Sequence, residues 1–203
     1  MTSVDELLHN YSIISEQVNR QQLQVLLKEL ENVLQSNTDG AVVEFGCYIG
    51  TTSLFIQRLL DTYQDSREFH VYDSFEGLPP KAPEDASPVG EQFVAGELSV
   101  SKKQFIHEFQ KASLKLPMIH KAWFSDLTAV DVPEKISFAF LDGDFYDSMH
   151  DSLRLVMPRM ERGAVIIIDD YAREALPGVV KAVSEALPGV SVKTAHNLGI
   201  IQL

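Results

Sequence analysis

The sequence predicts an α/β domain built on a mainly parallel sheet with helices on both of its faces. Short runs rich in Val, Ile and Phe alternate with longer amphipathic segments from residue 41 onwards. Strands that are apolar along their whole length are typical of sheets buried on both sides. The length of 203 residues and the hydrophobic share of 45% suit a single domain with one large core.

The expected elements follow one another in a regular order. Residues 5–35 carry leucines at helical spacing without Gly or Pro, so they predict one helix or two within an N-terminal helical extension, residues 1–38. We expect residues 39–203 to form the α/β domain itself. Its strands are expected at Ala41–Phe45, Glu68–Asp73, Met118–Phe124, Ile136–Asp142, Ala164–Asp169, Val190–Lys193 and Gly199–Leu203. Its helices are expected at Thr51–Tyr63, Ser101–Ala112, Ser148–Met160 and Gly178–Leu187.

The charge balance excludes several classes of partner. Lys and Arg number 17 against 29 Asp and Glu, a formal net charge of −12, which would repel nucleic acid and anionic membranes. A single cysteine, Cys47, rules out an internal disulfide and favours a reducing compartment. The N-terminus lacks a signal pattern and no apolar run is long enough to span a bilayer, so we expect a soluble, cytoplasmic protein. A homodimer formed through the N-terminal helix is one possible oligomeric state.

Ligands of parallel sheets bind at the carboxyl ends of the strands, so the residues that follow each strand matter most. Gly46 and Gly50 follow the first strand and permit a tight turn, and residues 51–53 are candidates to cap the next helix. The turn matches neither GxGxxG nor a P-loop, and a purely structural turn is an equally good interpretation. Asp73 ends the second strand, where an acid can accept hydrogen bonds from ribose hydroxyls or cap a helix.

Two pairs of acids give the strongest signal. Asp142 and Asp144 follow the fourth strand, and Asp169 and Asp170 follow the fifth. Neighbouring strand ends lie about 5 Å apart, so the four carboxylates would crowd together unless protons or a cation relieved their repulsion. An all-oxygen cluster suits a hard cation such as Mg²⁺, and the sequence has no Cys/His cluster of zinc spacing. The alternative is that both pairs are turn residues with solvated side chains.

One long segment has the composition of a loop. Residues 78–97 are rich in Pro, Gly and Glu, and they are too many for a passive connection. A mobile lid over the site and a disordered surface insertion are equally good interpretations.

Several motifs together resemble a known enzyme class. They are VVEFGCYIGTTS, VYDSFEGLP, AWFSD, LDGDFYDSMHDSL and GAVIIIDDY, and they cover most of residues 41–187. They are similar to class I S-adenosylmethionine-dependent O-methyltransferases and, within these, to the macrocin O-methyltransferase (TylF/MycF) family. The resemblance implies a Rossmann-like, doubly wound, mainly parallel seven-stranded sheet with a reversed last hairpin. It also implies that S-adenosylmethionine lies across the first turns.

The resemblance further implies roles for individual residues. Contacts to S-adenosylmethionine would come from Glu44, Gly46, Tyr48, Ile49, Gly50, Thr51, Thr52, Ser53, Asp73, Ser74, Ser125, Asp126 and Asp142. A divalent cation, Mg²⁺ or another, would bind to Asp142, Asp169 and Asp170. Asp142 or Asp144 would act as the catalytic base. Catechol-type relatives carry a lysine base three residues after the first metal-binding Asp, and this chain has Phe145 there.

The expected function is S-adenosylmethionine-dependent, divalent-metal-assisted methylation of a hydroxyl on a small natural product or sugar. One alternative is a metal- and nucleotide-dependent transferase of the DxD type, which the LDGD motif also suits. The other is a non-catalytic S-adenosylmethionine-binding protein. The first turn carries no Lys or Arg to hold a diphosphate, and a scaffold has no use for three crowded acids, so the methyltransferase is favoured.

Overall fold

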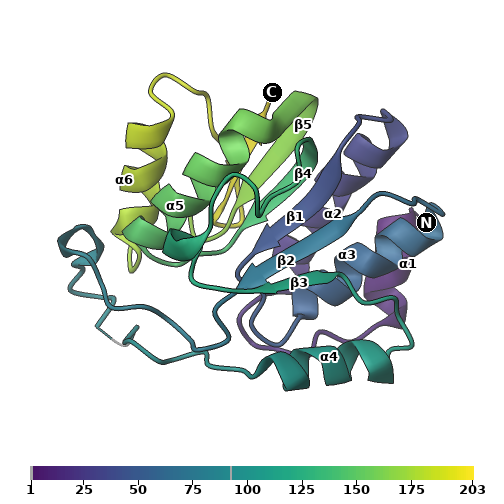
Figure 1. Ribbon diagram of the computed structural model, residues 1–203, viewed down its shortest axis with the longest axis horizontal. Coiled ribbons are helices and arrows are strands. Elements are labelled where there is room, and N and C mark those ends of the chain that lie inside the picture. Colours follow the sequence, from purple (N-terminus) through teal and green to yellow (C-terminus); the bar gives the residue numbers. More distant parts are fainter. Residues whose placement is uncertain (1, 92) are drawn as a thin grey trace.

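The computed structural model describes residues 2–91 and 93–203, which form one twisted sheet between two layers of helices (Figure 1). Its seven strands lie in the order β3-β2-β1-β4-β5-β7-β6. The strands from β1 to β5 run parallel, and β7 is antiparallel to both β5 and β6. The prediction of a mainly parallel, seven-stranded sheet with a reversed last hairpin is confirmed.

The elements have the following bounds. The strands are β1 Ala41–Phe45, β2 Phe69–Asp73, β3 Met118–Lys121, β4 Ile136–Leu141, β5 Met160–Ile168, β6 Lys193–Ala195 and β7 Leu198–Gln202. The α-helices are α1 Ser3–Asn10, α2 Arg20–Gln35, α3 Thr51–Thr62, α4 Lys102–Lys111, α5 Tyr146–Val156 and α6 Pro177–Ala186. Short 3-10 helices are η1 Pro83–Asp85, η2 Phe124–Asp126 and η3 Met157–Arg159.

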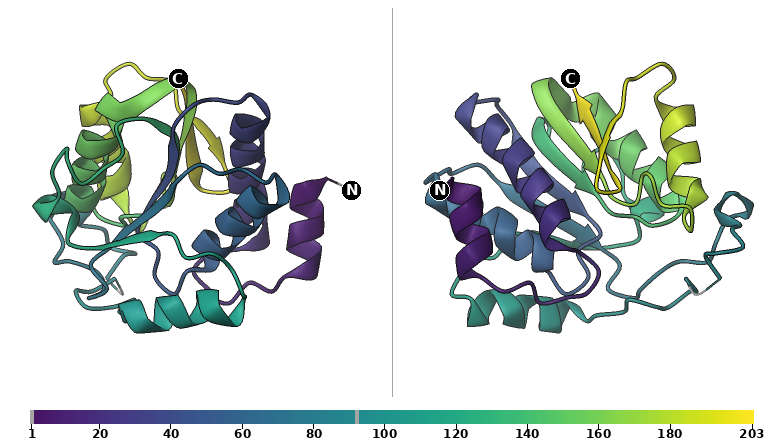
Figure 2. Two further views of the ribbon diagram at one scale, coloured as in Figure 1. Left: turned by 45° about the vertical axis from the view of Figure 1, so that its right-hand side comes forward. Right: turned by 180° about the vertical axis from the view of Figure 1, so that it is seen from behind.

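Successive strand residues face two separate cores. In β1, Val42 packs among residues of α1 to α4, whereas Val43 packs among residues of α5 and α6. The view from behind in Figure 2 shows α1, α2 and α3 on one face of the sheet and α5 and α6 on the other. Because both faces are covered, β1 and β4 are buried along their whole length and are mostly apolar, which is the pattern seen in the sequence.

The N-terminal region forms two helices rather than one. α1 ends at Asn10, and α2 begins after Asn19, whose side chain accepts hydrogen bonds from the backbone N–H groups of the first turn. Leu23 and Leu27 of α2 are fully buried in the same core as α3. The extension therefore packs into the domain, and a division at residue 38 stays a prediction.

The third strand is shorter than the predicted Met118–Phe124. β3 is an edge strand that pairs with β2 only as far as Asp73 and Lys121. Because β2 ends at this point, the chain beyond Lys121 has no strand to pair with, and it turns into a 3-10 helix that begins at Phe124.

The sixth strand lies later in the chain than the predicted Val190–Lys193. It occupies Lys193–Ala195, and the two residues that follow, His196 and Asn197, have left-handed backbones with φ of 50° and 69°. A two-residue turn of this kind joins directly paired strand residues, so it fixes where β6 must end.

Helix α5 begins at Tyr146 and ends at Val156, earlier at both ends than the predicted Ser148–Met160. Pro158 has no backbone N–H for the helical ladder, so the chain tightens into a 3-10 turn. β5 then begins at Met160, earlier than predicted.

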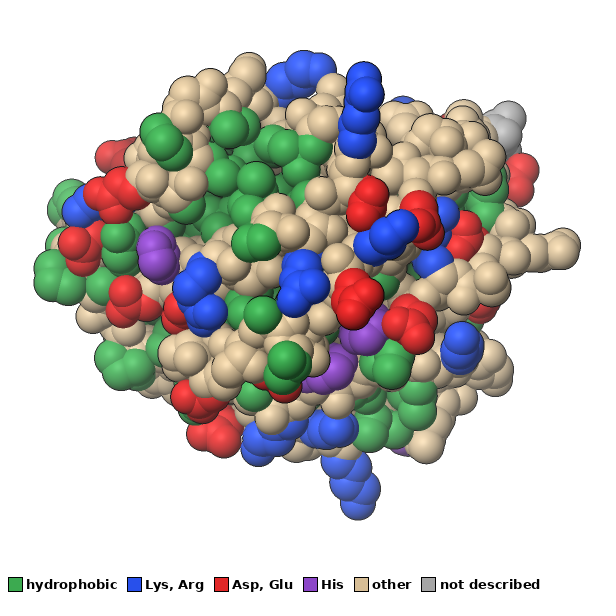
Figure 3. All heavy atoms as spheres, turned by 45° about the horizontal axis from the view of Figure 1, so that its top comes forward, with side chains coloured by type: hydrophobic (Ala, Val, Ile, Leu, Met, Phe, Trp, Pro, Cys, Tyr) green, Lys and Arg blue, Asp and Glu red, His purple; other side chains and the backbone are tan. Residues whose placement is uncertain are grey.

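The surface carries both signs of charge. Acidic and basic side chains are interspersed over the face shown in Figure 3. Within residues 2–91 and 93–203, no helix is long and apolar enough to cross a membrane.

Candidate active site

The strand register brings the predicted site residues into one row. Phe45, the last residue of β1, pairs with Tyr72 of β2 and with Leu141, the last residue of β4. Leu141 in turn pairs with Ile168, the last residue of β5. The residues one step further along these strands are Asp73, Gly46, Asp142 and Asp169. Backbone hydrogen bonds of 2.8–2.9 Å continue across this row, so it is part of the sheet's carboxyl edge.

A pocket lies over this row and encloses about 780 Å³, part of it open to solvent. This size is within the usual range for small-molecule sites. Among the predicted site residues, the pocket is lined by Gly46, Tyr48, Asp73, Ser74, Asp142, Asp144, Asp169 and Asp170. The remaining lining residues are Gln17, Gly77, Leu78, Pro79, Leu98, Ala122, Trp123, Phe124, Gly143, Ser148 and Arg173.

Other predicted residues lie near the pocket without lining it. Glu44 and residues 50–53 belong to β1 and the start of α3 and are largely buried. Ile49 lines a neighbouring cavity instead. Residues 125–126 lie in η2, and their neighbours Trp123 and Phe124 line the pocket in their place.

The turn after β1 depends on two glycines. A Cβ on Gly46, which has φ of +87°, would lie 2.0 Å from the carbonyl oxygen of Asp142, so only glycine lets the turn approach β4 this closely. Gly50, with φ of +94°, is the N-cap of α3 and makes no side-chain cap bond. The prediction that residues 51–53 cap this helix is therefore wrong, because the left-handed Gly50 ends the turn and places them inside the first helical turn.

Asp73 holds the turn after β1 from the neighbouring strand. Its Oδ2 accepts hydrogen bonds from the backbone N–H groups of Cys47 and Tyr48, at 2.8 and 3.2 Å. Its Oδ1 accepts from the N–H of Phe75 at 2.6 Å. Asp73 is therefore not a helix cap, and since a carboxylate offers about four acceptor positions, about one is left for a ligand.

Glu44 is a buried acid in β1. It is 0% exposed, and its Oε2 accepts a hydrogen bond from the Ser53 hydroxyl. Its Oε1 has no hydrogen-bond partner among the described residues. Burial, with a further contribution from the charge of Asp73, raises the pKa of Glu44 to about 8. The carboxyl is therefore mostly protonated at neutral pH.

The four acids that follow β4 and β5 perturb one another. Burial raises the pKa of all four, to about 8 for Asp144 and about 7 for Asp169. Neighbouring carboxylate charges add to this effect at Asp142, Asp144 and Asp169. Asp144 and Asp170 also have left-handed backbones, with φ of 58° and 53°, and both residues line the pocket. The acids are therefore not free turn residues in water.

Two residues that the sequence did not point to hold this cluster. Gln22 of α2 donates a hydrogen bond from Nε2 to Oδ1 of Asp169 at 3.2 Å. Arg173 donates from Nη1 to both carboxylate oxygens of Asp170, each at 3.1 Å. In this arrangement, no group of three or more His, Cys, Asp or Glu side chains in the described part of the chain has the geometry of a metal centre. The spacing of Arg173 three residues after Asp170 is the only local signal that could have revealed either contact.

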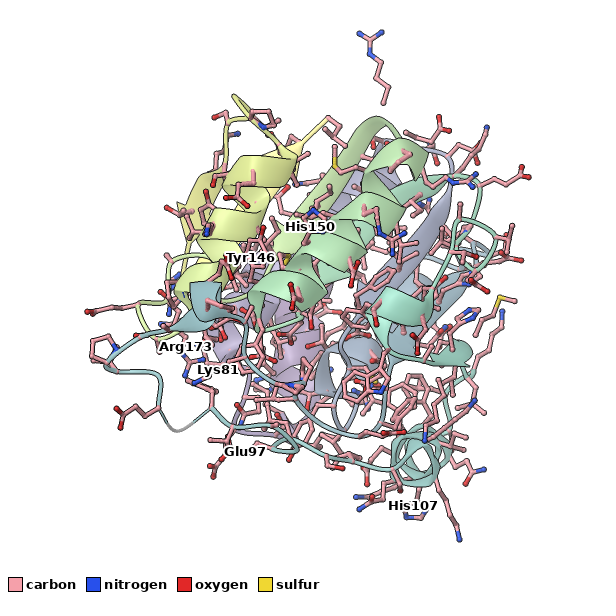
Figure 4. The ribbon with its side chains drawn as sticks, turned by 60° about the vertical axis from the view of Figure 1, so that its left-hand side comes forward. Lys81, Glu97, His107, Tyr146, His150 and Arg173 are labelled. Atoms are coloured by element: carbon pink, nitrogen blue, oxygen red, sulfur yellow. The ribbon has the colours of Figure 1, made fainter. Side chains whose placement is uncertain are left out.

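The segment 78–97 is attached to the pocket and to the loop after β5; Gln92 within it lies outside the described residues. The N–H of Leu78 donates to the carbonyl of Glu97 at 2.8 Å, which closes the base of the segment. Asp85 accepts a hydrogen bond from the N–H of Tyr146, the first residue of α5, at 2.8 Å. Figure 4 shows Lys81 and Arg173 where the segment approaches α5 and α6. Within the segment, Leu78 and Pro79 line the pocket.

Comparison with known proteins adds a family and several relatives. The macrocin-O-methyltransferase (TylF) family matches residues 9–190. The 8-demethyl-8-(2,3-dimethoxy-alpha-L-rhamnosyl)-tetracenomycin-C 4'-O-methyltransferase of Streptomyces olivaceus is 33% identical over 153 residues, which cover 72% of this chain and 58% of that protein. The demethyldecarbamoylnovobiocin O-methyltransferase of Streptomyces niveus is 27% identical over 156 residues, covering 70% and 56%. The solved structure of the O-methyltransferase NovP matches the fold with a TM-score of 0.79 at 23% identity, covering 91% of this chain and 80% of that one.

The chain spans less than two thirds of the length of these curated relatives. The family match nevertheless extends over nearly the whole chain, and it includes the glycine turn after β1 and the acids after β4 and β5. These are the features that the register gathers around one pocket. The chain therefore belongs to the macrocin-O-methyltransferase (TylF) family.

Proposed function

We propose that this chain transfers the methyl group of S-adenosylmethionine to a hydroxyl of a small natural product or of a sugar attached to one, with the help of a divalent cation. The observation that carries the proposal is the single pocket in which the glycine turn after β1 meets the acids after β4 and β5. Two curated relatives support it, since they are named as O-methyltransferases of a rhamnosyl tetracenomycin and of demethyldecarbamoylnovobiocin.

The cofactor would lie across the turn after β1. The backbone of Gly46 and Tyr48, which line the pocket, would hold its methionine portion, and Asp73 would use its remaining acceptor position for a ribose hydroxyl. Trp123 lines the pocket and would offer a flat surface to the adenine. Residues 125–126 would have to approach the amino edge of the adenine from η2, beside the pocket. The positive sulfonium suits a pocket in which carboxylates outnumber basic groups.

A divalent cation would be held by Asp142, Asp169 and Asp170. The donor set fits a hard cation such as Mg²⁺, because every donor is a carboxylate oxygen and ionising these acids beside one another is costly without a counter-charge. When bound, such an ion lowers the pKa of a coordinated hydroxyl and fixes its orientation.

The transfer itself requires alignment and the removal of one proton. A methyl group on a sulfonium is already activated, so the pocket mainly has to place the acceptor oxygen in line with it. Asp142 or Asp144 would accept the hydroxyl proton, since both line the pocket. Phe145 is buried and supplies no base.

The two alternative functions have weaker support. A nucleotide-dependent transferase needs basic groups for a diphosphate, whereas Arg173 alone is cationic among the described lining residues and is paired with Asp170. A non-catalytic S-adenosylmethionine-binding protein would have no use for four acids in its pocket.

Calorimetric titration followed by an acceptor screen tests the proposal. We expect S-adenosylhomocysteine to bind without Mg²⁺ and a nucleoside diphosphate not to bind. Methyl transfer is then measured on a panel of hydroxylated sugars, phenols and polyketides, with and without Mg²⁺. Binding of the diphosphate alone would refute the proposal in favour of the DxD-type transferase. Cofactor binding without transfer to any acceptor would favour the non-catalytic function.

The metal assignment has its own variant. Asp169→Asn should lower metal-dependent transfer by about 100-fold or more while its affinity for S-adenosylhomocysteine stays within about twofold, because the residue would bind the cation and not the cofactor. Asp147→Asn, which removes the same charge from an exposed position of α5, serves as the control. Full activity of the Asp169→Asn variant would show that the metal assignment is wrong.

A further inference from the structure

Arg173 is the basic side chain next to the four acids of the pocket. Its Nη1 lies 3.1 Å from both carboxylate oxygens of Asp170, whose side chain is buried. No other lysine or arginine is present among the described residues that line the pocket. Its charge also opposes the rise in the pKa of Asp144 and of Asp169. Arg173 therefore acts as the counter-charge of the whole cluster.

This contact competes with a cation for the oxygens of Asp170. Both oxygens of Asp170 face the guanidinium, and Oδ1 of Asp169 accepts hydrogen bonds from Gln22 and from the backbone N–H of Asp170. A dication approaching Asp170 would meet the positive charge of Arg173 at short range. The pair therefore occupies the Asp170 oxygens that a cation would use.

The Arg173 side chain has a place to move. It is 39% exposed, so one side of it already faces solvent. Its guanidinium carbon lies 4.9 Å from the centre of the Phe93 ring, in the segment 78–97. A cation–π contact of this kind holds a guanidinium without requiring a carboxylate partner. Release from Asp170 therefore leaves Arg173 stacked and solvated rather than buried and unpaired.

We propose that Arg173 is an exchangeable counter-cation, which holds Asp170 while the metal is absent and leaves it when a divalent cation binds. This inference rests on the proposed metal-assisted function. It assigns Arg173 as a positioning residue, since it acts on the cation through Asp170. Each binding event must first open the Arg173–Asp170 pair, so the pair lowers the apparent affinity for the cation.

Binding of Mn²⁺, followed by the electron paramagnetic resonance signal of the free ion, tests this role without any methyl acceptor. Arg173→Gln should bind Mn²⁺ about tenfold or more tightly than the wild type, because the competing charge-assisted bond is gone. Arg162→Gln removes the same charge from an exposed position near the start of β5, away from the acids, and should bind Mn²⁺ within about twofold of the wild type. Calorimetry with S-adenosylhomocysteine confirms that each variant is folded.

A second variant covers the case in which Arg173→Gln does not fold. Arg173→Lys retains the charge, but its shorter side chain weakens the pair, so a gain in Mn²⁺ affinity of about two- to threefold is expected. If the wild type binds Mn²⁺ and the folded Arg173 variants bind it equally or more weakly, the role of Arg173 as an exchangeable counter-cation is refuted. The metal assignment would then still stand. Absence of Mn²⁺ binding from the wild type and the variants alike, with cofactor binding intact, would overturn both the metal assignment and this inference.

Discussion

Replacing Glu44 by Gln should make the ligand-free protein more stable than the wild type above neutral pH. Glu44 is fully buried in β1, and burial raises its pKa from 4.5 to about 8. Below the lower value the carboxyl is protonated in both the folded and the unfolded chain, so it adds no pH dependence. Between the two values only the unfolded chain releases the proton, and the free energy of unfolding falls as the pH rises. Above pH 8 both states are ionised and the loss stays constant.

The pKa difference corresponds to a decrease in the free energy of unfolding of the wild type of about 3 kcal/mol at pH 7 and about 5 kcal/mol above pH 8. Glutamine has the same shape without the charge, so the gap in the free energy of unfolding between Glu44→Gln and the wild type should widen by these amounts from pH 4.5 to pH 9. Urea unfolding at a series of pH values measures it. Glu134→Gln, which removes a carboxyl from an exposed position before β4, serves as the control. A gap for Glu44→Gln that stays within about 1 kcal/mol over this range would refute the reasoning.

Two other substitutions test the backbone around the pocket. Gly46→Ala should lower the free energy of unfolding by about 2–4 kcal/mol, because its Cβ would lie 2.0 Å from the carbonyl oxygen of Asp142. Gly189→Ala, with a similar φ of +83° and no described atom within 4 Å of the new Cβ, should cost only about 1 kcal/mol in urea unfolding, and equal losses would contradict the argument. Asp85→Ala should cost about 1–3 kcal/mol, because its carboxylate accepts two backbone hydrogen bonds, one of them from Tyr146 at the start of α5. Hydrogen exchange at the Tyr146 amide measures the loosening, and unchanged protection would speak against it.

The convergence of the pocket acids could be predicted because it follows from local patterns. Asp142 and Asp169 each come directly after an apolar run that ends a strand, and parallel strands end at one edge of the sheet. The sequence thus indicates both the strands and the edge where their ends meet. The roles of these acids in binding or catalysis stay predictions, since the shared pocket places them together without showing what they hold.

The partners of these acids could not be predicted, because they come from distant parts of the chain. Gln22 lies 147 residues before Asp169 and looks in the sequence like one more polar position on an amphipathic helix. Asp85 lies in a segment without helical or strand periodicity and contacts Tyr146, 61 residues away. The residue at which β3 ends could not be predicted for the same reason, because it depends on where the neighbouring strand β2 ends. Contacts across such separations depend on the packed fold and leave no periodic signal.

The acids are held in place by the backbone rather than by attraction to one another. Asp142 and Asp169 continue the hydrogen-bond ladder of the sheet, and the left-handed Asp144 and Asp170 turn the chain so that both pairs line the pocket. Left-handed non-glycine residues cost roughly 1 kcal/mol each, so this arrangement works against both strain and repulsion. Among the described lining residues, five carboxylates face one guanidinium. A sulfonium together with a dication would bring these charges close to balance, whereas either one alone would leave a clear excess of negative charge. Because both ligands would be positive and would draw on the same excess of negative charge, binding of either one should weaken the attraction of the pocket for the other.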